Sequence, residues 1–131
     1  MPRFWVSIYH PDNYDSSIED EVTHHALDEL NVDHDSAVEP KSISQAIDDL
    51  NDEMVSAGVR AFVGGLYPPT EAKSIRLQNG EAVVSDGPYL KTAEHVGGFW
   101  VLECASLEEA VEWGRKAAVA CRTPVEVRPF H

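Results

Sequence analysis

Four short stretches rich in aliphatic and aromatic residues predict β-strands. They are residues 3–9, 59–66, 98–104 and 124–130. In the first stretch two sets of side chains face opposite ways, with Phe4, Val6 and Ile8 on one side and Trp5, Ser7 and Tyr9 on the other. Residues 74–85 predict a β-hairpin, because Asn79-Gly80 suits a two-residue primed turn between two short runs.

Apolar residues at helical spacing predict three helices, at residues 16–30, 42–58 and 107–121. Two of these helices begin with a capping box, Ser42 with Gln45 and Ser106 with Glu109. Residues 31–41 lack any such periodicity and are predicted to form a loop.

Leaving aside the helix at 16–30, the predicted order of elements is strand, helix, strand, hairpin, strand, helix, strand. Without the hairpin this is the βαββαβ pattern of ferredoxin-like folds. We therefore expect an α+β domain whose helices pack on one face of an antiparallel sheet. The other face also carries apolar side chains, because residues 99–102 are apolar on both sides and Trp5 and Tyr9 face away from the aliphatic side. A second copy of the chain is expected to cover that face, giving a homodimeric α+β barrel with a cleft between the two sheets.

The formal net charge of −13 comes from one segment near the start of the chain. Residues 11–53 contain fourteen Asp and Glu residues and one Lys, whereas acids and bases balance in the rest. Direct binding to nucleic acid is not expected, because no basic stripe is present to contact phosphates. The two cysteines lack CxxC spacing, and no apolar run has the length of a membrane span. We expect one cytoplasmic domain over residues 1–131, with an acidic insertion at about 11–40.

The chain resembles a known family over most of its length, from about Lys41 to Phe130 together with the first strand. The stretch GGLYPPTEAKSIRLQNGEAVVSDGPYLKTAEHVGGFWVLE carries most of the resemblance, followed by SLEEAVEWGRKA and a terminal VEVRPF. Its most specific parts are Asp86-Gly87-Pro88 and then Thr92, Glu94 and Gly97-Gly98. These features are similar to the YCII-related domain, in the branch named after its Asp-Gly-Pro-Phe (DGPF) motif.

The resemblance implies a dimeric ferredoxin-like barrel. It also implies a cleft in which the motif aspartate, often partnered by a histidine, takes part in acid–base chemistry. Most members have no established reaction, so the resemblance says more about the fold than about the chemistry. The chain departs from the family pattern in three places: Tyr89 replaces the phenylalanine, Lys91 replaces an acid, and residues 11–40 are longer and more acidic.

Asp86 and His10 are the candidate catalytic residues. Asp86 is either a proton-transfer group in a cleft or the anchor of an Asx turn, in which its carboxylate accepts backbone N–H groups. His10 lies just past the first strand and is either the partner of Asp86 or a surface histidine. Strict alternation places His10 on the helix side of the sheet, so a partnership with Asp86 requires a bulge or an early end of the strand.

Several aromatic and polar side chains either line a binding pocket or pack in the core, namely Trp5, Ser7, Tyr9, Tyr89 and Trp100. No metal or other cofactor is expected. His24, His25 and His34 lie among acids, and His24 is one helical turn from Asp28. This pattern fits the edge of a metal site, but a solvated acidic helix face explains it equally well. The remaining residues of interest are expected to face solvent, His95 and His131, or to pack, Cys104 and Cys121.

Two functions of different class fit the sequence. The first is an enzyme for an unknown small organic substrate, in which Asp86 transfers a proton during an elimination, isomerisation or hydrolysis. His10 or a tyrosine would polarise that substrate. The second is a non-catalytic dimeric module that binds a small molecule, or a basic protein partner through its acidic segment. The enzyme requires Asp86 in a cleft beside a second polar group, whereas the module requires Asp86 tied to backbone amides and a cleft filled by side chains.

Overall fold

The computed structural model describes residues 1–11 and 41–131. Its elements in chain order are β1 (Arg3–Pro11), α2 (Ile43–Ser56), β2 (Arg60–Gly65), the 3-10 turn η2 (Pro69–Glu71), β3 (Lys73–Gln78), β4 (Glu81–Asp86), β5 (Glu94–Glu103), α3 (Leu107–Cys121) and β6 (Val125–Pro129). They confirm the strands, the hairpin and the two helices predicted within the described residues. The helix predicted at 16–30 lies outside these residues, as do His24, His25 and His34.

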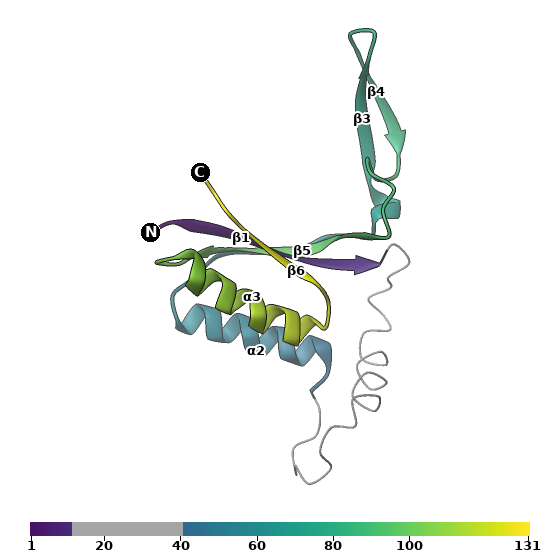
Figure 1. Ribbon diagram of the computed structural model, residues 1–131. Helices are drawn as coiled ribbons and strands as arrows, with labels where there is room; N and C mark the ends of the chain where they lie inside the picture. Colours follow the sequence, from purple (N-terminus) through teal and green to yellow (C-terminus); the bar gives the residue numbers. More distant parts are fainter. Residues whose placement is uncertain (12–40) are drawn as a thin grey trace.

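The main sheet has the strand order β2-β5-β1-β6, and each neighbouring pair is antiparallel. β3 and β4 form a separate two-stranded sheet. Figure 1 shows α2 and α3 together on one side of the main sheet. This arrangement confirms the α+β class and is compatible with a ferredoxin-like fold. Within the described part of the chain, neither helix is both long enough and apolar enough to cross a membrane.

The hydrophobic core lies between the two helices and the side of the sheet that faces them. Phe4, Val6 and Ile8 of β1 are buried there, as their alternation predicts. On the neighbouring strand β5, Trp100 pairs with Val6 and Leu102 pairs with Phe4, so their side chains share the same face. Trp100 is therefore a core residue, with only 3% of its surface exposed.

A single amide connects α2 to two strands of the sheet. The Oδ1 atom of Asn51 accepts hydrogen bonds from Trp100 Nε1 at 2.9 Å and from Arg60 Nη1 at 3.1 Å. Its Nδ2 atom donates to the backbone oxygen of Ile47 at 3.0 Å. Asn51 therefore fixes the position of the Trp100 ring relative to the helix.

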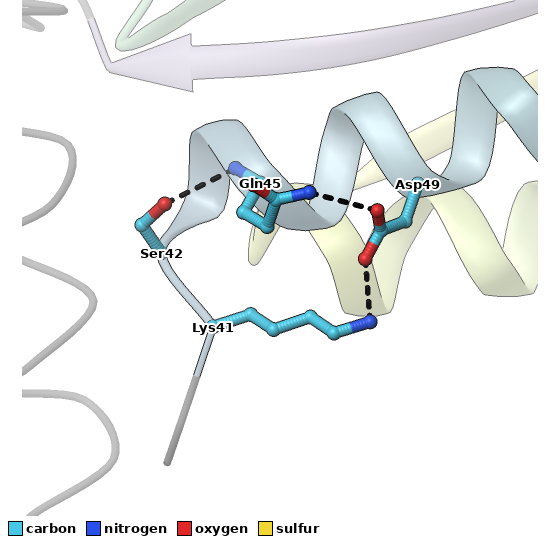
Figure 2. A network of polar contacts seen from close by, with 4 residues as sticks. All are labelled: Lys41, Ser42, Gln45 and Asp49. Atoms are coloured by element: carbon cyan, nitrogen blue, oxygen red, sulfur yellow. Dashed lines mark hydrogen bonds and ion pairs between the residues drawn. The ribbon is translucent and has the colours of Figure 1, made fainter.

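The first turn of α2 is held by a small polar network (Figure 2). Ser42 Oγ accepts from the backbone N–H of Gln45 at 3.1 Å, which is the predicted cap. The Gln45 side chain and the Lys41 ammonium both donate to the carboxylate of Asp49. The Lys41 ammonium and then the Gln45 amide lower the pKa of Asp49. The network supports the helix while Asp49 is ionised, and this support is lost as the pH falls through the pKa of that carboxyl.

The thiol of Cys104 is buried at the end of β5, next to the start of α3. Burial raises the pKa of Cys104 to about 11, and the nearby Glu109 carboxylate adds to the shift. The side chain is therefore a neutral thiol at physiological pH and a poor nucleophile. Its position agrees with the packing role predicted for it, and Cys121 is buried in the same core.

The side of the main sheet away from the helices has no covering layer within the described residues. We call it the open face, and its central side chains are Trp5, Ser7, Phe62, Phe99 and Val101. Trp5 stacks on Phe99 with 4.5 Å between ring centroids, and Phe62 lies 5.7 Å from Phe99 on the other side. Phe62 stays 56% exposed. The open face is thus apolar and aromatic at its centre, as predicted.

The hairpin of β3 and β4 stands apart from the main sheet, and we call it the arm. Figure 1 shows it rising from one end of the main sheet, on the side away from α2 and α3. Its tip is the predicted turn, in which Asn79 and Gly80 have φ angles of 52° and 82°. Two consecutive residues with positive φ are what a primed hairpin turn requires.

Candidate functional site

A pocket of about 300 Å³ lies at the end of the main sheet where β1 and β2 finish and β5 begins. Ile8 and Trp100 reach it from the sheet, and Ile47 reaches it from α2. The loop after β2, from Leu66 to Pro69, forms another side. Most of the wall is aliphatic, aromatic or proline, as is common for sites that bind small organic molecules.

Two histidines from adjacent strands contribute to this pocket. His10 near the end of β1 pairs directly with His95 near the start of β5 in the antiparallel ladder. Directly opposed residues in such a ladder place their side chains on the same face, so both imidazoles border the same space. His95 is half-buried here. The expectation that it faces solvent is wrong, because β5 begins at Glu94 rather than at residue 98 and carries His95 into the sheet.

A bulge in β5 sets which β5 residue faces His10. The pairing between β1 and β5 shifts after Ile8, so that Gly97 is an extra residue on β5 without a partner on β1. The imidazole of His10 lies over Gly97, where the Cβ atom of any other residue would overlap the ring. β1 itself is regular as far as Pro11, so His10 keeps the side of Ile8, which also borders the pocket, as strict alternation predicts. The bulge lies on the neighbouring strand β5, where it brings His95 opposite His10.

The polar groups of the pocket are few. Apart from the backbone, the described lining offers the two imidazoles and the hydroxyl of Tyr67, which is a largely exposed residue. Within residues 1–11 and 41–131 the lining includes neither a carboxylate nor a Lys or Arg. A ligand in this space therefore meets hydrocarbon on most sides and a pair of imidazoles that can donate or accept hydrogen bonds.

Asp86 lies away from this lining, at the end of β4. It pairs across the arm with Lys73, and the two side chains form an ion pair with exposed fractions of 88% for Asp86 and 64% for Lys73. The turn that follows is held by other groups. Gly87 N–H donates to Ala72 O at 2.8 Å, and Ser74 Oγ donates to Gly87 O at 2.5 Å. Within the described chain Asp86 is thus neither in the pocket nor the acceptor of the turn's backbone amides.

The other predicted pocket residues do not lie together. Trp100 borders the pocket from the core, next to Phe99, which the sequence reading did not single out. Trp5 and Ser7 lie on the open face, where the Ser7 hydroxyl is buried without a hydrogen-bond partner in the described residues. Tyr89 is exposed beside the arm, with the guanidinium of Arg76 4.7 Å from its ring centroid. Tyr9 is half-buried, and its backbone is bound to residues 123–124 before β6.

Comparison with known proteins identifies the family of the chain. A family model of the YCII-related domain matches residues 25–130. The chain belongs to the YCII-related domain family. An uncharacterized protein of Rhizobium meliloti (strain 1021) is 40% identical over 78 residues, which is 58% of this chain and 63% of that protein. The YCII-related assignment confirms the resemblance seen in the sequence, and the DGPF branch within the family stays a prediction.

In this YCII-related chain, groups of three or more His, Cys, Asp or Glu side chains suited to a metal ion are absent from the described residues. The candidate edge formed by His24 and Asp28 lies outside them. Among the described residues, the candidate site is therefore the apolar pocket that His10 and His95 border.

Mutation of either residue of the exposed Asp86–Lys73 ion pair in the arm is expected to change the free energy of unfolding only slightly. Asp86→Asn should lower the free energy of unfolding by about 1 kcal/mol or less, because both partners are exposed and such pairs contribute little. Lys73→Gln should give a similarly small loss. Urea denaturation of both variants measures this. A much larger loss in Asp86→Asn alone would show that the carboxylate anchors the turn.

Proposed function

We propose that the protein binds a small, mostly apolar organic molecule in the pocket at the end of the main sheet, and that His10 and His95 exchange a proton with it. One observation carries this proposal. Two imidazoles on paired strand ends border an otherwise apolar cavity of about 300 Å³. Imidazole is the side chain whose ordinary pKa is closest to neutral, so one ring can act as base while the other acts as acid.

The histidine pair replaces Asp86 as the centre of the acid–base hypothesis. Asp86 is held by Lys73 on the arm, whereas His10 and His95 reach the pocket. The reaction classes remain those expected from the sequence: an elimination, an isomerisation or a hydrolysis. Each of them needs a base to remove a proton and an acid to supply one, and a largely apolar wall strengthens the hydrogen bonds that position the substrate.

A second candidate function is binding without chemistry. It is favoured by the position of the motif carboxylate outside the described lining of the pocket, although Asp86 binds Lys73 and not the backbone amides expected for such a module. In this case the histidines would orient a bound ligand through hydrogen bonds, and the chain would be a dimeric binding module. The two functions differ in one measurable respect, since only the enzyme converts what it binds.

We also propose that the protein is a homodimer in which the open faces of two copies cover one another. Phe62 is 56% exposed, and it continues the stacked rings of Trp5 and Phe99 at the centre of that face. Exposed aromatic clusters of this kind are typical of protein interfaces. The dimer would remove these rings from water without using the surface that α2 and α3 already cover.

Binding can be tested by filling the pocket from one residue. Gly65 borders the pocket, and a Cβ atom added there would have no neighbour within 4 Å. Gly65→Phe should therefore place a ring in the cavity without straining the backbone. We expect a screen of small aromatic and aliphatic compounds by NMR to shift the amide signals of His10, His95 and Gly97 in the wild type. The same compounds should give no such shifts in Gly65→Phe.

Ala61→Phe is the matched control, because it adds the same ring to β2 at a residue that does not border the pocket. It should bind as the wild type does. Unchanged binding by Gly65→Phe, or shifts that map to another surface, would overturn the proposed site. For a compound that binds and is converted, His95→Asn should lower the turnover by about 100-fold or more. Binding without conversion of any compound would favour the binding module.

A further inference from the structure

The arm presents an apolar side that nothing covers within the described residues. Ile75 on β3 pairs with Val84 on β4, and Leu77 pairs with Ala82, so these four side chains share one face of the hairpin. Ile75, Leu77 and Val84 are 64%, 79% and 63% exposed. A hairpin of two strands is marginally stable in water unless it packs on something else. The arm therefore has the properties of a segment that is completed by another surface.

The position of the arm points to that surface. Figure 1 shows the arm standing at one end of the main sheet on the side of the open face, at a steep angle to the strands. The arm and the open face thus border the same space from two directions. A molecule bound on Trp5, Phe62 and Phe99 would therefore lie beside the arm. Each chain thus has two apolar surfaces next to one another that the described residues leave uncovered.

The charges of these surfaces indicate which partner fits. The arm carries Lys73 and Arg76 against Glu81 and Asp86, so its charges balance. At the ends of the strands that form the open face, Arg3 pairs with Glu103 and Arg128 pairs with Glu126. The whole chain, in contrast, has a net charge of −13 that comes from residues 11–53.

These balanced surfaces would attract neither a basic nor an acidic partner. A charge-balanced surface can, however, meet a copy of itself without opposing like charges. A second copy is therefore the partner whose charge these surfaces suit best.

We propose that the arm of each copy packs its Ile75, Leu77 and Val84 side against the second copy, so that two arms clasp the dimer from opposite ends. The proposal rests on the homodimer proposed above and adds a second interface to it. Two-fold symmetry makes the contact reciprocal, since the surface that one arm meets on its partner is met in the same way by the partner's arm.

Sedimentation equilibrium tests the arm separately from the open face. The wild type should sediment with twice 14.5 kDa at micromolar concentration. Leu77→Asp should raise the dissociation constant of the dimer by at least about tenfold, because it places a charge in an apolar contact. Val119→Asp is the matched control. Val119 is 76% exposed on α3, which lies on the other side of the sheet, and its substitution should leave the dimer unchanged.

Phe62→Asp separates the two proposals. If Phe62→Asp weakens the dimer and Leu77→Asp does not, the arm proposal is overturned while the homodimer stands. If the wild type is a monomer, both fail. A second measurement leaves the apolar side of the arm and its turn unchanged. One copy carries a spin label on Gln78→Cys, at an exposed residue of β3, and is mixed with an isotope-labelled copy that has no spin label. The spin label should broaden NMR signals of the isotope-labelled copy, and the absence of such broadening in a proven dimer would also overturn the arm proposal.

Discussion

Leu102→Ala is expected to lower the free energy of unfolding by about 2–5 kcal/mol, the range found when a fully buried leucine is truncated. Leu102 is 0% exposed, and it lies on β5 between Phe4 of β1 and Arg60 of β2 in the ladder. Its side chain packs between the sheet and the helices. The neighbouring side chains therefore have little freedom to fill the cavity that the truncation leaves. Urea denaturation at a fixed protein concentration measures the loss, since an oligomer would make the midpoint depend on concentration.

Leu107→Ala provides the control for this experiment. Leu107 is the first residue of α3 and is 45% exposed, so the same truncation there should cost less than about 1 kcal/mol. Equal losses at the two positions would contradict the placement of Leu102 at the centre of the core.

Gly97→Ala is expected to cost about 1–3 kcal/mol, because a Cβ atom at residue 97 cannot coexist with the imidazole of His10 in its present position. The same change should remove ligand binding that depends on the direction of that imidazole. A double-mutant cycle identifies the cause. In a His10→Ala background the obstacle is gone, so Gly97→Ala should cost only a few tenths of a kcal/mol there.

The outcome of that cycle decides whether His10 lies over the bulge. Equal costs of Gly97→Ala in the two backgrounds would mean that the glycine is needed for its backbone alone, and His10 would lose its assigned place at the pocket. Gly98→Ala is a useful comparison. Its added Cβ atom would lie 3.1 Å from the backbone oxygen of Gly64, so its cost should not depend on His10.

The elements within the described residues could be predicted because each has a strong local signal. The period of two in β1 separates Phe4 and Val6 from Trp5, and the serine caps Ser42 and Ser106 mark the starts of both helices. The order of the elements then limits the topology to few arrangements. The family could also be recognised from the sequence, since the motif around Asp86 lies within the segment that the family model matches.

The candidate site was harder to predict, because it depends on register rather than on residue type. The bulge at Gly97 places His95 on the same face as His10, and the alternation of β1 does not contain that information. His95 was missed because a strand start was placed three residues after it, at residue 98, although β1 offers backbone partners as far as Pro11. Asp86 attracted attention through its motif, yet its position on a projecting hairpin follows from how the arm leaves the sheet, which sequence alone does not determine.

The Asn51 amide has a consequence for the thermodynamics of binding at the pocket. It holds Trp100 by a hydrogen bond and is itself held to the backbone of Ile47, and both of these residues border the cavity. The ring and the helix are therefore already in place before any ligand arrives. A ligand that enters does not have to freeze this part of the wall, so the loss of side-chain entropy on association falls mainly on the ligand and on the loop after β2.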